Sequence, residues 1–524
     1  MALLQRLISF KPLLALRPTT GSVLRIAADI GALWTAFLIG WFFIEDRSYA
    51  TLLTQQSKHI FPFLGIFSLL TFIAYADAGL YTCSHRYSLA TKISRIIRIN
   101  LVLLILAVAA HMFAPASSGI TPRILLTSFT GAAILACLAR IISSVLRSED
   151  HEISYPAEQR EPDESRVLII GGAGYIGSAL VEKLLGLGKH VTVLDALHYG
   201  DEPLARVAGH PELTVIREDF RHIEALTRAM SGMGVVIHLG GLVGDPACAV
   251  DPELTVDINV TATKLVGEIA KACGAKRFIF ASSCSVYGAC DETVDETSHF
   301  NPQSLYARSK VASEALLGSL HSDDFAVTCL RFATVYGISG RTRFDLVANL
   351  LCAKAVRDGV ITVFGPDQWR PFIHVDDVAK AIVTALTAPV ECVAGEVFNV
   401  GSDAQNYTLG QLAALIKAQV PDAKIISDDG AVDRRNYHVS FAKIRNQLGF
   451  EPSWTLESGI AQVIAVVRTN QVGHYSLPTY SNVLYLKECG SQSFGSFKIT
   501  GWETEYMSID HLAPSHGPRQ AAAA

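Results

Sequence analysis

The sequence lacks two features that mark common functional classes: an excess of basic residues and a metal-binding cysteine pattern. Its 524 residues carry 44 Lys and Arg against 49 Asp and Glu. Because the basic footprint of a nucleic-acid-binding protein is missing, we expect no nucleic-acid partner. The ten cysteines are scattered without a C-x-x-C pair. We therefore expect no zinc or other metal site and interpret them as reduced thiols in a reducing compartment.

Charged side chains are also scarce in much of the first 150 residues, where hydrophobic residues dominate. Four apolar runs stand out: Ile26–Ile44, Ile60–Ala76, Ile99–Ala116 and Ile124–Val145. Each is close to the length that crosses a hydrocarbon core of about 30 Å. Four such runs in succession favour transmembrane helices over the buried helices of a soluble domain. We therefore predict an α-helical membrane domain of four transmembrane helices over residues 1–147, in contact with the lipid bilayer.

Basic residues indicate the orientation of these predicted spans. They are frequent before the first span, between the second and third, and at the end of the fourth, where Arg140 and Arg147 lie, and sparse in the other two loops. Under the positive-inside rule both ends of the domain face the cytoplasm. We expect a multi-pass protein of a bacterial-type inner (plasma) membrane with a cytoplasmic C-terminal head. Arg6, Lys11 and Arg17 interrupt the first segment, which disfavours a cleaved signal peptide.

The rest of the chain has the pattern of an α/β protein. Residues 148–165 are polar, acidic and interrupted by proline, which is typical of a solvated linker. After them, strand-like apolar runs alternate with helical patterns, which predicts βαβ units and a doubly wound parallel sheet. The strand-like runs are Val167–Ile170, Val191–Leu194, Leu213–Ile216, Val235–Leu239, Arg277–Ala281 and Val327–Arg331.

A glycine-rich turn follows the first of these strands, in the stretch VLIIGGAGYIG at residues 167–177. Gly171 allows a tight turn, Gly174 lets a pyrophosphate approach the backbone, and Gly177 lets the next helix pack on the strand. Tyr175 and Ile176 begin that helix, whose N-terminal N–H groups and dipole favour an anion. This geometry predicts a dinucleotide-binding Rossmann domain, to which we assign residues 166–331.

Side chains after the later strands complete the expected cofactor site, since ligands bind at the carboxyl ends of parallel strands. Asp195 would accept hydrogen bonds from both adenosine ribose hydroxyls and repel a 2′-phosphate, which predicts NAD rather than NADP. Asp219 is expected to meet the adenine amino group. The other expected cofactor contacts are Phe220, Leu239, Gly240 and Gly241.

Tyr306 and Lys310 are four residues apart and share one face of a predicted helix. We expect the Lys310 ammonium and a positively charged nicotinamide to lower the pKa of the Tyr306 phenol. Such a tyrosine can take a proton from a sugar hydroxyl while hydride leaves the same carbon. Lys310 can also bind the nicotinamide ribose, and Ser283 would hydrogen-bond the reacting oxygen.

Residues 166 to about 465 resemble the extended short-chain dehydrogenases/reductases that act on nucleotide-diphosphate sugars. The matching stretches are IIGGAGYIGS, VVIHLGG, FIFASSCSVYGA, YARSK, LRFATVYG, RPFIHVDDVA, VFNVGS and DRRNYHVSFAKIRNQLGFEP. The resemblance implies a catalytic triad of Ser283, Tyr306 and Lys310, a homodimer formed through the heads, and a smaller substrate-binding subdomain over residues 332–465 that is interleaved with the sheet. It further implies that Asn259 helps at the cofactor site, and that Thr334, Arg370 and Arg435 contact the substrate, the arginines at its diphosphate.

The reaction subtype is suggested by the residues after Ser283. The 4,6-dehydratases that resemble this chain carry an acidic pair there, because elimination of water needs an extra acid and base. Here Cys284 and Ser285 occupy those positions, which favours a UDP-galactose 4-epimerase type of reaction. Thr334 stands where that type carries asparagine, so the sugar and the base stay open. A 4,6-dehydratase, a 4-ketoreductase and an NAD-binding scaffold or sensor remain alternatives.

The membrane half resembles, more weakly, the four-span domain of bacterial polysaccharide-biosynthesis dehydratases. The likeness lies in DIGALWTAFLIG and AGLYTCSHRYS, and it implies a role in cell-surface polysaccharide biosynthesis. Residues 466–524 form a C-terminal extension without an assigned role. Within it, NVLYLKECG and SFGSFKITGW show a short β-like alternation.

Overall fold

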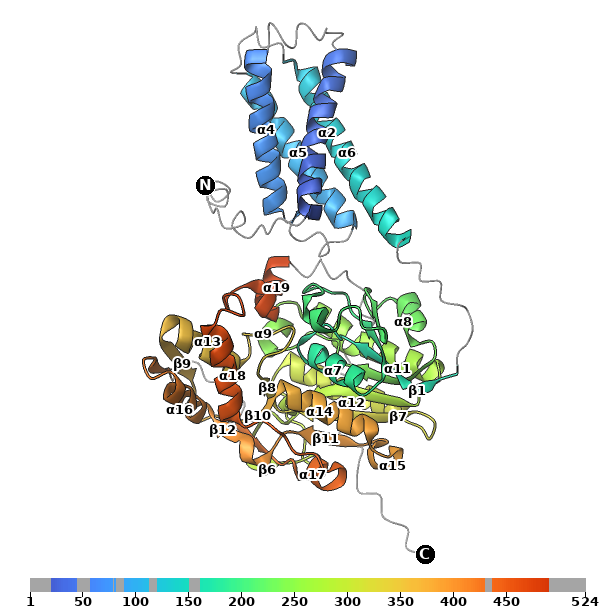
Figure 1. The fold of residues 1–524 in the computed structure, drawn as a ribbon, viewed down its shortest axis with the longest axis vertical. Helices are drawn as coiled ribbons and strands as arrows, with labels where there is room; N and C mark the ends of the chain where they lie inside the picture. The colour runs from blue at the N-terminus through green and yellow to red at the C-terminus, as the bar shows by residue number, and fades with distance from the viewer. Residues whose placement is uncertain are drawn as a thin grey trace, which may run out of the picture. The chain divides into compact units, whose positions relative to one another are not determined.

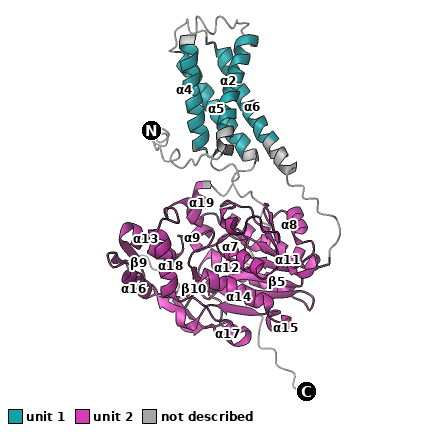
Figure 2. Cartoon of the chain, viewed as in Figure 1, with its two compact units in different colours: residues 1–156 teal, residues 157–524 magenta. Residues whose placement is uncertain are grey.

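The chain consists of two compact units, residues 1–156 and residues 157–524 (Figure 2). The computed structural model describes residues 20–44, 57–78, 80–81, 89–112, 120–149, 161–428 and 436–489. The first unit is helical and the second is an α/β head (Figure 1).

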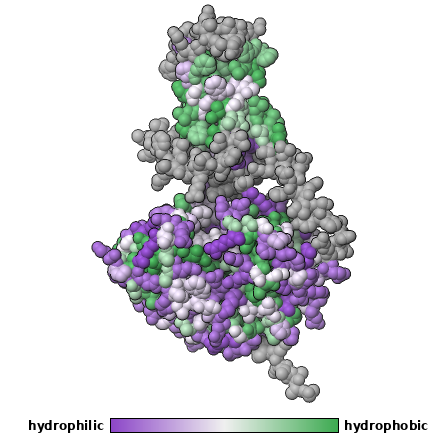
Figure 3. Space-filling model, in the orientation of Figure 1, coloured by the Kyte–Doolittle hydropathy of each residue, from purple (hydrophilic) through white to green (hydrophobic). Residues whose placement is uncertain are grey.

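The described part of the first unit is a bundle of long apolar helices. They are α2 (Thr20–Ile39) with its π-helical continuation η2 (Gly40–Ile44), α4 (Ser57–Asp77), α5 (Leu89–His111) and α6 (Pro122–Glu149). By length and composition, four stretches could cross a membrane: Arg25–Phe43, His59–Ala76, Lys92–His111 and Pro122–Ile142. Apolar side chains dominate the visible surface of the described bundle (Figure 3). Large apolar residues such as Leu101 and Ile105 are 56% and 61% exposed.

The third helix begins and ends earlier than the predicted span at 99–116, since α5 runs from Leu89 to His111. Lys92, Arg95 and Arg98 belong to the basic segment that the sequence predicts between the second and third spans, but they lie within this helix. In the structure Arg95 donates a hydrogen bond from Nη1 to the Ala78 carbonyl oxygen at 2.6 Å. The Arg95 guanidinium thus has a partner just after α4, while Arg95 itself lies within α5.

One ion pair is buried inside the bundle. Arg140 on α6 donates from Nη1 and Nη2 to the two carboxylate oxygens of Asp29 on α2, both at 2.6 Å. The two side chains are 8% and 1% exposed. Arg140, which the sequence suggested as a loop charge at the end of the fourth span, is therefore an internal partner of Asp29. Nearby, Asn100 donates to the Tyr75 hydroxyl at 2.6 Å.

Asp29→Ala should destabilise the bundle by about 3–5 kcal/mol, because it leaves the Arg140 guanidinium buried without its carboxylate. Thermal unfolding of the purified full chain in detergent measures the loss. The double variant Asp29→Leu/Arg140→Leu is the control, since it removes both charges, and most of the stability should return. Equal melting of Asp29→Ala and the native chain would contradict this account.

The head is built on a seven-stranded sheet of order β11-β7-β5-β4-β1-β2-β3, in which all pairs are parallel. The strands are β1 (Asp163–Ile170), β2 (His190–Leu194), β3 (Leu213–Ile216), β4 (Met233–His238), β5 (Arg277–Ser283), β7 (Ala326–Phe332) and β11 (Val397–Val400). The prediction of a doubly wound parallel sheet is confirmed. The strand order reverses between β1 and β4, which is where such sheets bind ligands.

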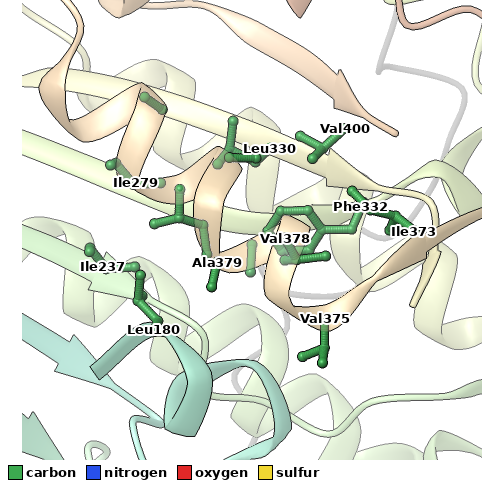
Figure 4. Close-up of a cluster of buried hydrophobic side chains, with 14 of the residues drawn as sticks. Leu180, Ile237, Ile279, Leu330, Phe332, Ile373, Val375, Val378, Ala379 and Val400 are labelled. Carbon is green, nitrogen blue, oxygen red and sulfur yellow. The ribbon is translucent and has the colours of Figure 1, made fainter. Parts of the chain in front are cut away.

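Helices cover both faces of this sheet, because successive strand residues point to opposite sides. On one face, Val167 and Ile169 pack with α7 (Tyr175–Gly186) and α14 (Val375–Thr387). Figure 4 shows part of this cluster, with Leu180 of α7 and Val378 of α14 among the labelled residues. On the other face, Leu168 and Ile170 pack with α8 (Ile223–Met230), α11 (Ala262–Ala272) and α12 (Leu305–Leu320).

A smaller layer, most of which follows β7, has its own apolar core, which includes Tyr336, Phe372, Leu412 and Ile460. Its strands are β8 (Thr334–Tyr336), β10 (Trp369–His374) and β12 (Asn406–Thr408) in one sheet, β9 (Val360–Phe364) with β13 (Lys424–Asp428), and β6 (Ala289–Val294) with β14 (Asn436–Val439). Its longer helices are α13 (Val347–Asp358), α16 (Leu409–Gln419), α17 (Ala442–Leu448) and α18 (Leu456–Arg468). α14 and β11 return from this region to the large sheet.

Short helices connect the main elements. They are η4 (Glu202–Val207), α9 (Asp245–Cys248), α10 (Pro252–Val256), η5 (Asp257–Thr261), η6 (Cys284–Tyr287), α15 (Val390–Val393), η7 (Asp403–Gln405), η8 (Pro478–Tyr480) and α19 (Asn482–Cys489). The β-like alternation of NVLYLKECG is a wrong indication, because residues 482–489 of this stretch form α19. SFGSFKITGW lies outside the described residues.

Candidate functional site

A pocket opens at the carboxyl ends of β1, β2 and β4, at the strand-order reversal. Eleven of the residues expected at the cofactor line it: Gly171, Gly174, Tyr175, Ile176, Gly177, Asp195, Asp219, Phe220, Leu239, Gly240 and Gly241. They come from four separate turns of the chain, which the parallel sheet brings to one edge. Asn259, Tyr306 and Lys310 are not part of this lining.

The glycines keep the turn between β1 and α7 free of side chains. Gly171 has φ +80°, and a Cβ there would lie 2.8 Å from the Gly240 nitrogen. A Cβ at Gly177 would overlap the Gly171 carbonyl oxygen and come within 2.6 Å of the Gly172 Cα. Only glycine fits at both positions. The open turn in front of the α7 N-terminus suits a dinucleotide pyrophosphate, so the residues present fit the predicted cofactor.

Asp195 is fixed at the pocket wall by backbone donors. Its carboxylate accepts from the Ala173 N–H at 3.0 Å and from the Leu197 N–H at 2.8 Å. Burial raises the pKa of Asp195, and these two hydrogen bonds oppose the rise. The carboxylate therefore joins the glycine turn to the loop after β2, where a ribose is expected.

Asp219 lines the pocket but its carboxylate is held by Arg221. The guanidinium donates to it from Nε at 3.1 Å and from Nη2 at 2.6 Å, and from Nη1 to Asp257 at 2.7 Å. Burial opposes ionisation of Asp219, but the Arg221 hydrogen bonds and charge hold its pKa below the usual range. Asp219 is therefore one half of an ion pair, and its contact with the adenine amino group stays a prediction.

The three catalytic candidates meet beside the pocket. Ser283 ends β5, and Tyr306 and Lys310 lie in the first two turns of α12. Ser304 caps that helix, since its hydroxyl accepts from the Ala307 N–H at 3.1 Å. The Ser283 side chain lies close enough to the Tyr306 phenol to lower its pKa. The structure thus brings the predicted hydroxyl, phenol and amine together from two elements.

Lys310 does not act on Tyr306 as the spacing suggested. Its Nζ donates to the Ala281 carbonyl oxygen at 2.7 Å and lies 5.8 Å from the Tyr306 ring centroid. Burial raises the pKa of Tyr306, and the Ser283 side chain only partly offsets the rise. Burial also lowers the pKa of Lys310 to about 8. In the protein without its cofactor, burial outweighs the lowering effects of Arg343 and Ser283, so the net shift of the Tyr306 pKa is upward.

Asn259 positions the backbone instead of contacting the pocket. Its amide donates to the Leu242 carbonyl oxygen at 2.9 Å and accepts from the Leu242 N–H at 2.8 Å. It also donates to the Ser309 hydroxyl at 3.2 Å. Both ends of the amide are used, so Asn259 supports the loop after β4, as the resemblance implies for a structural helper near the active site. Its direct contact with the cofactor stays a prediction.

The substrate-side candidates lie on the smaller layer. Thr334 begins β8 and pairs in register with Phe372 of the adjacent β10. Arg370, on β10, is 5% exposed and donates to the Trp369 carbonyl oxygen at 2.7 Å and to Gln368 Oε1 at 3.2 Å. Arg435 lies outside the described residues.

A buried polar network that the sequence did not reveal lies behind Ser283. Arg331 on β7 donates from Nε and Nη2 to Glu314 on α12, at 3.0 and 2.7 Å, and from Nη1 to the Tyr287 hydroxyl at 2.8 Å. Ser282 also donates to Glu314. The pair fixes α12 against β5 and β7. The only local signal was a glutamate four residues after Lys310.

The pocket wall also contains residues that the motifs did not include. They are Leu194, Ala196, Leu197, His198, Tyr199, Gly200, Arg221, Leu242, Val243, Ile258, Arg341, Arg343 and Asn482, together with Ala173 of the glycine turn. The Arg341 guanidinium lies 3.5 Å from the Tyr199 ring centroid, and its buried Nε and Nη2 atoms find no hydrogen-bond partner among the residues that the structure describes. An anionic ligand could satisfy them. In the part of the chain that the structure describes, no group of three His, Cys, Asp or Glu side chains could hold a metal ion.

Comparisons with known proteins point to one family. The model of the NAD dependent epimerase/dehydratase family matches residues 167–401. A dTDP-glucose 4,6-dehydratase of Streptomyces griseus is 30% identical over 316 residues, which cover 57% of this chain and 93% of that protein. A UDP-glucose 4-epimerase of Mycolicibacterium smegmatis is 29% identical over 313 residues, with coverage of 58% and 98%.

Solved structures agree with these relatives. MoeE5 in complex with UDP-glucuronic acid and NAD is similar with a TM-score of 0.52 and 27% identity, over 58% of this chain and 99% of that one. The match leaves more than a third of this chain without a counterpart there.

Gly177→Ala should abolish measurable NAD binding, because the new Cβ would overlap the backbone of the glycine turn. Equilibrium binding of NAD to the purified chain measures the effect, and circular dichroism checks that the fold is kept. Gly186→Ala is the matched control in the same helix, since a Cβ there meets nothing within 4 Å. Native affinity in Gly177→Ala would refute the assignment of the turn.

Proposed function

The chain belongs to the NAD dependent epimerase/dehydratase family and its cofactor is NAD, and from this premise we propose that it is a membrane-anchored nucleotide-diphosphate-sugar 4-epimerase. The observation that carries the proposal is the meeting of Ser283, Tyr306 and Lys310 beside the cofactor pocket, without a carboxylate at positions 284 and 285.

The side chains have separate roles in such a reaction. When bound, NAD accepts hydride from C4 of the sugar and returns it. The Ser283 hydroxyl holds the C4 oxygen, and the Tyr306 oxygen takes its proton. The Lys310 ammonium, which donates to the Ala281 carbonyl oxygen, would bind the nicotinamide ribose. After the 4-keto sugar turns in the site, Tyr306 returns the proton to the same oxygen, and the product is the 4-epimer.

The neighbourhood of Ser283 favours this proton relay over elimination of water. Cys284 is 1% exposed, its Sγ is 3.2 Å from the Arg331 carbonyl oxygen, and burial raises the pKa of its thiol. The Ser285 side chain is a neutral hydroxyl, which cannot replace the carboxylate that elimination of water needs. Glu314 is engaged by Arg331. These residues do not supply the second acid and base that dehydration needs.

A 4,6-dehydratase is the second candidate, and one carboxylate favours it. Asp245, on α9, acts electrostatically on Tyr306 and accepts from the Ser304 hydroxyl at 2.6 Å. It could serve as the additional base. The 30% identical relative bears the name of that enzyme.

We propose further that the four helices of the first unit anchor the head to a bacterial-type inner membrane. Support comes from four stretches of sufficient length and hydropathy, and from outward apolar residues such as Leu101 and Ile105. A cytoplasmic head would have access to nucleotide sugars and deliver its product close to membrane glycosyltransferases of polysaccharide biosynthesis. A homodimer through the heads stays a prediction. On α12, the exposed positions that a partner head could reach are Arg308, Gly318 and Ser319.

Incubation of the full chain with UDP-glucose, UDP-N-acetylglucosamine and dTDP-glucose, followed by NMR of the products, tests the reaction. A 4-epimer without net formation of NADH is expected. Tyr306→Phe should lower the rate by about 10²–10⁴-fold, because it removes the proton acceptor. Tyr407→Phe is the matched control, since that hydroxyl contacts Glu457. A 4-keto-6-deoxy product would replace the proposal with the dehydratase.

Reporter fusions test the anchor and its orientation. A fluorescent protein that matures only in the cytoplasm, fused to the C-terminus, should be bright in the membrane fraction. Alkaline phosphatase, active only outside the cytoplasm, should be inactive at the same position. The opposite pattern would reverse the proposed orientation, and a soluble fluorescent product would refute the anchor.

A further inference from the structure

The C-terminal segment 473–489 contributes to the cofactor pocket, although it lies beyond residues 167–401 of the family match. It contains η8 and α19, and Asn482 at the start of α19 lines the pocket with Tyr199, Arg341 and Arg343. α19 lies beside α9 in the fold (Figure 1).

Asn482 joins two loops of the pocket wall to Asp345 and is 7% exposed. Its side-chain nitrogen donates to the Val243 carbonyl oxygen, in the loop after β4, at 2.9 Å. Its side-chain oxygen accepts from the Tyr199 hydroxyl, in the loop after β2, at 3.0 Å. Its backbone N–H donates to Asp345 Oδ2 at 2.8 Å. The side-chain nitrogen, the side-chain oxygen and the backbone N–H of Asn482 are therefore all hydrogen-bonded.

The third of these contacts ends on a buried ion pair. Asp345 accepts from Arg343 Nε at 2.9 Å and from Nη2 at 3.0 Å, and the two side chains are 13% and 7% exposed. Arg343 itself faces the pocket. The start of α19 is thus attached to a rigid feature of the wall rather than to a mobile surface side chain.

Two apolar side chains anchor the rest of the helix. Tyr485 is fully buried, with its ring centroid 4.6 Å from that of Tyr199. Leu486 is 1% exposed and belongs to a cluster with Leu242 and Ile258, against which Tyr306 packs. The helix therefore spans from the ribose side of the pocket to the catalytic tyrosine.

The segment is also held before α19. The Phe344 N–H donates to the Tyr480 carbonyl oxygen at 2.9 Å, and the two rings pack edge to face with centroids 5.4 Å apart. The Gly473 N–H donates to the Tyr480 hydroxyl at 2.8 Å. The Phe344 contacts attach Tyr480 to the segment that follows β8, and the Gly473 hydrogen bond joins two residues within 473–489.

We propose that residues 473–489 form a strap that retains NAD, with Asn482 as its positioning residue. The loops that Asn482 joins both line the pocket, so opening them for release of NAD requires its bonds and the Tyr485 and Leu486 contacts to break. Slow release suits a reaction in which hydride returns to the same substrate. The inference rests on binding of NAD and does not depend on which reaction the site performs.

The test is the rate of NAD release from the full chain in detergent, without any sugar nucleotide. The protein is loaded with radiolabelled NAD and chased with excess unlabelled NAD, and retained label is counted on filters. Asn482→Ala should release NAD at least about tenfold faster, which corresponds to about 1.4 kcal/mol. Leu484→Ala is the matched control on the same helix, because Leu484 is 39% exposed, and its release should equal the native rate.

Tyr199→Phe provides a second variant that keeps the ring and removes only the hydroxyl bonded to Asn482. If the strap acts through this bond, Tyr199→Phe accelerates release, and the double variant is slower than the product of the two single effects. Native release rates in both single variants would overturn the strap, as would an equal acceleration in Leu484→Ala. A chain that lacks epimerase activity but shows Asn482-dependent release would refute the proposed reaction and support the strap.

Discussion

The close approach of two backbones at the centre of the sheet is the constraint on which the cofactor site depends. Gly171 and Gly240 follow the adjacent parallel strands β1 and β4, and a Cβ on Gly171 would come 2.8 Å from the Gly240 nitrogen. The pocket exists because side chains are missing there and because the strand order reverses at that pair. The polar side chains of the site, which include Asp195, Asp219 and Arg343, line the pocket that this gap leaves open.

Buried ion pairs hold the walls of that gap in place. Arg221 binds Asp219 and Asp257 near the expected adenine, Arg343 binds Asp345, and Arg331 binds Glu314 behind Ser283. A buried charge without its partner is costly, so each pair specifies one arrangement of its segments. The first unit applies the same principle, with Asp29 and Arg140 between two apolar helices.

Sequence patterns predicted the parts of this molecule whose cause is local. The β1 strand, the glycine turn and Asp195 lie within one βαβ unit, where apolar runs and the freedom of glycine leave few alternatives. The same reasoning did not reveal the partners of Asp219 and Lys310. It assumed free side chains, whereas Arg221 holds Asp219 and the Ala281 carbonyl oxygen holds Lys310.

The sequence by itself determined the parallel sheet, the four apolar helices and the identity of the dinucleotide turn, because periodicity and glycine conformation are properties of neighbouring residues. Only the tertiary structure decided which distant groups meet. Asn482 contacts Tyr199 from 283 positions away, and Arg140 meets Asp29 across 111. No local pattern encodes such contacts, since they arise when packing of the whole core brings separate segments to the same place.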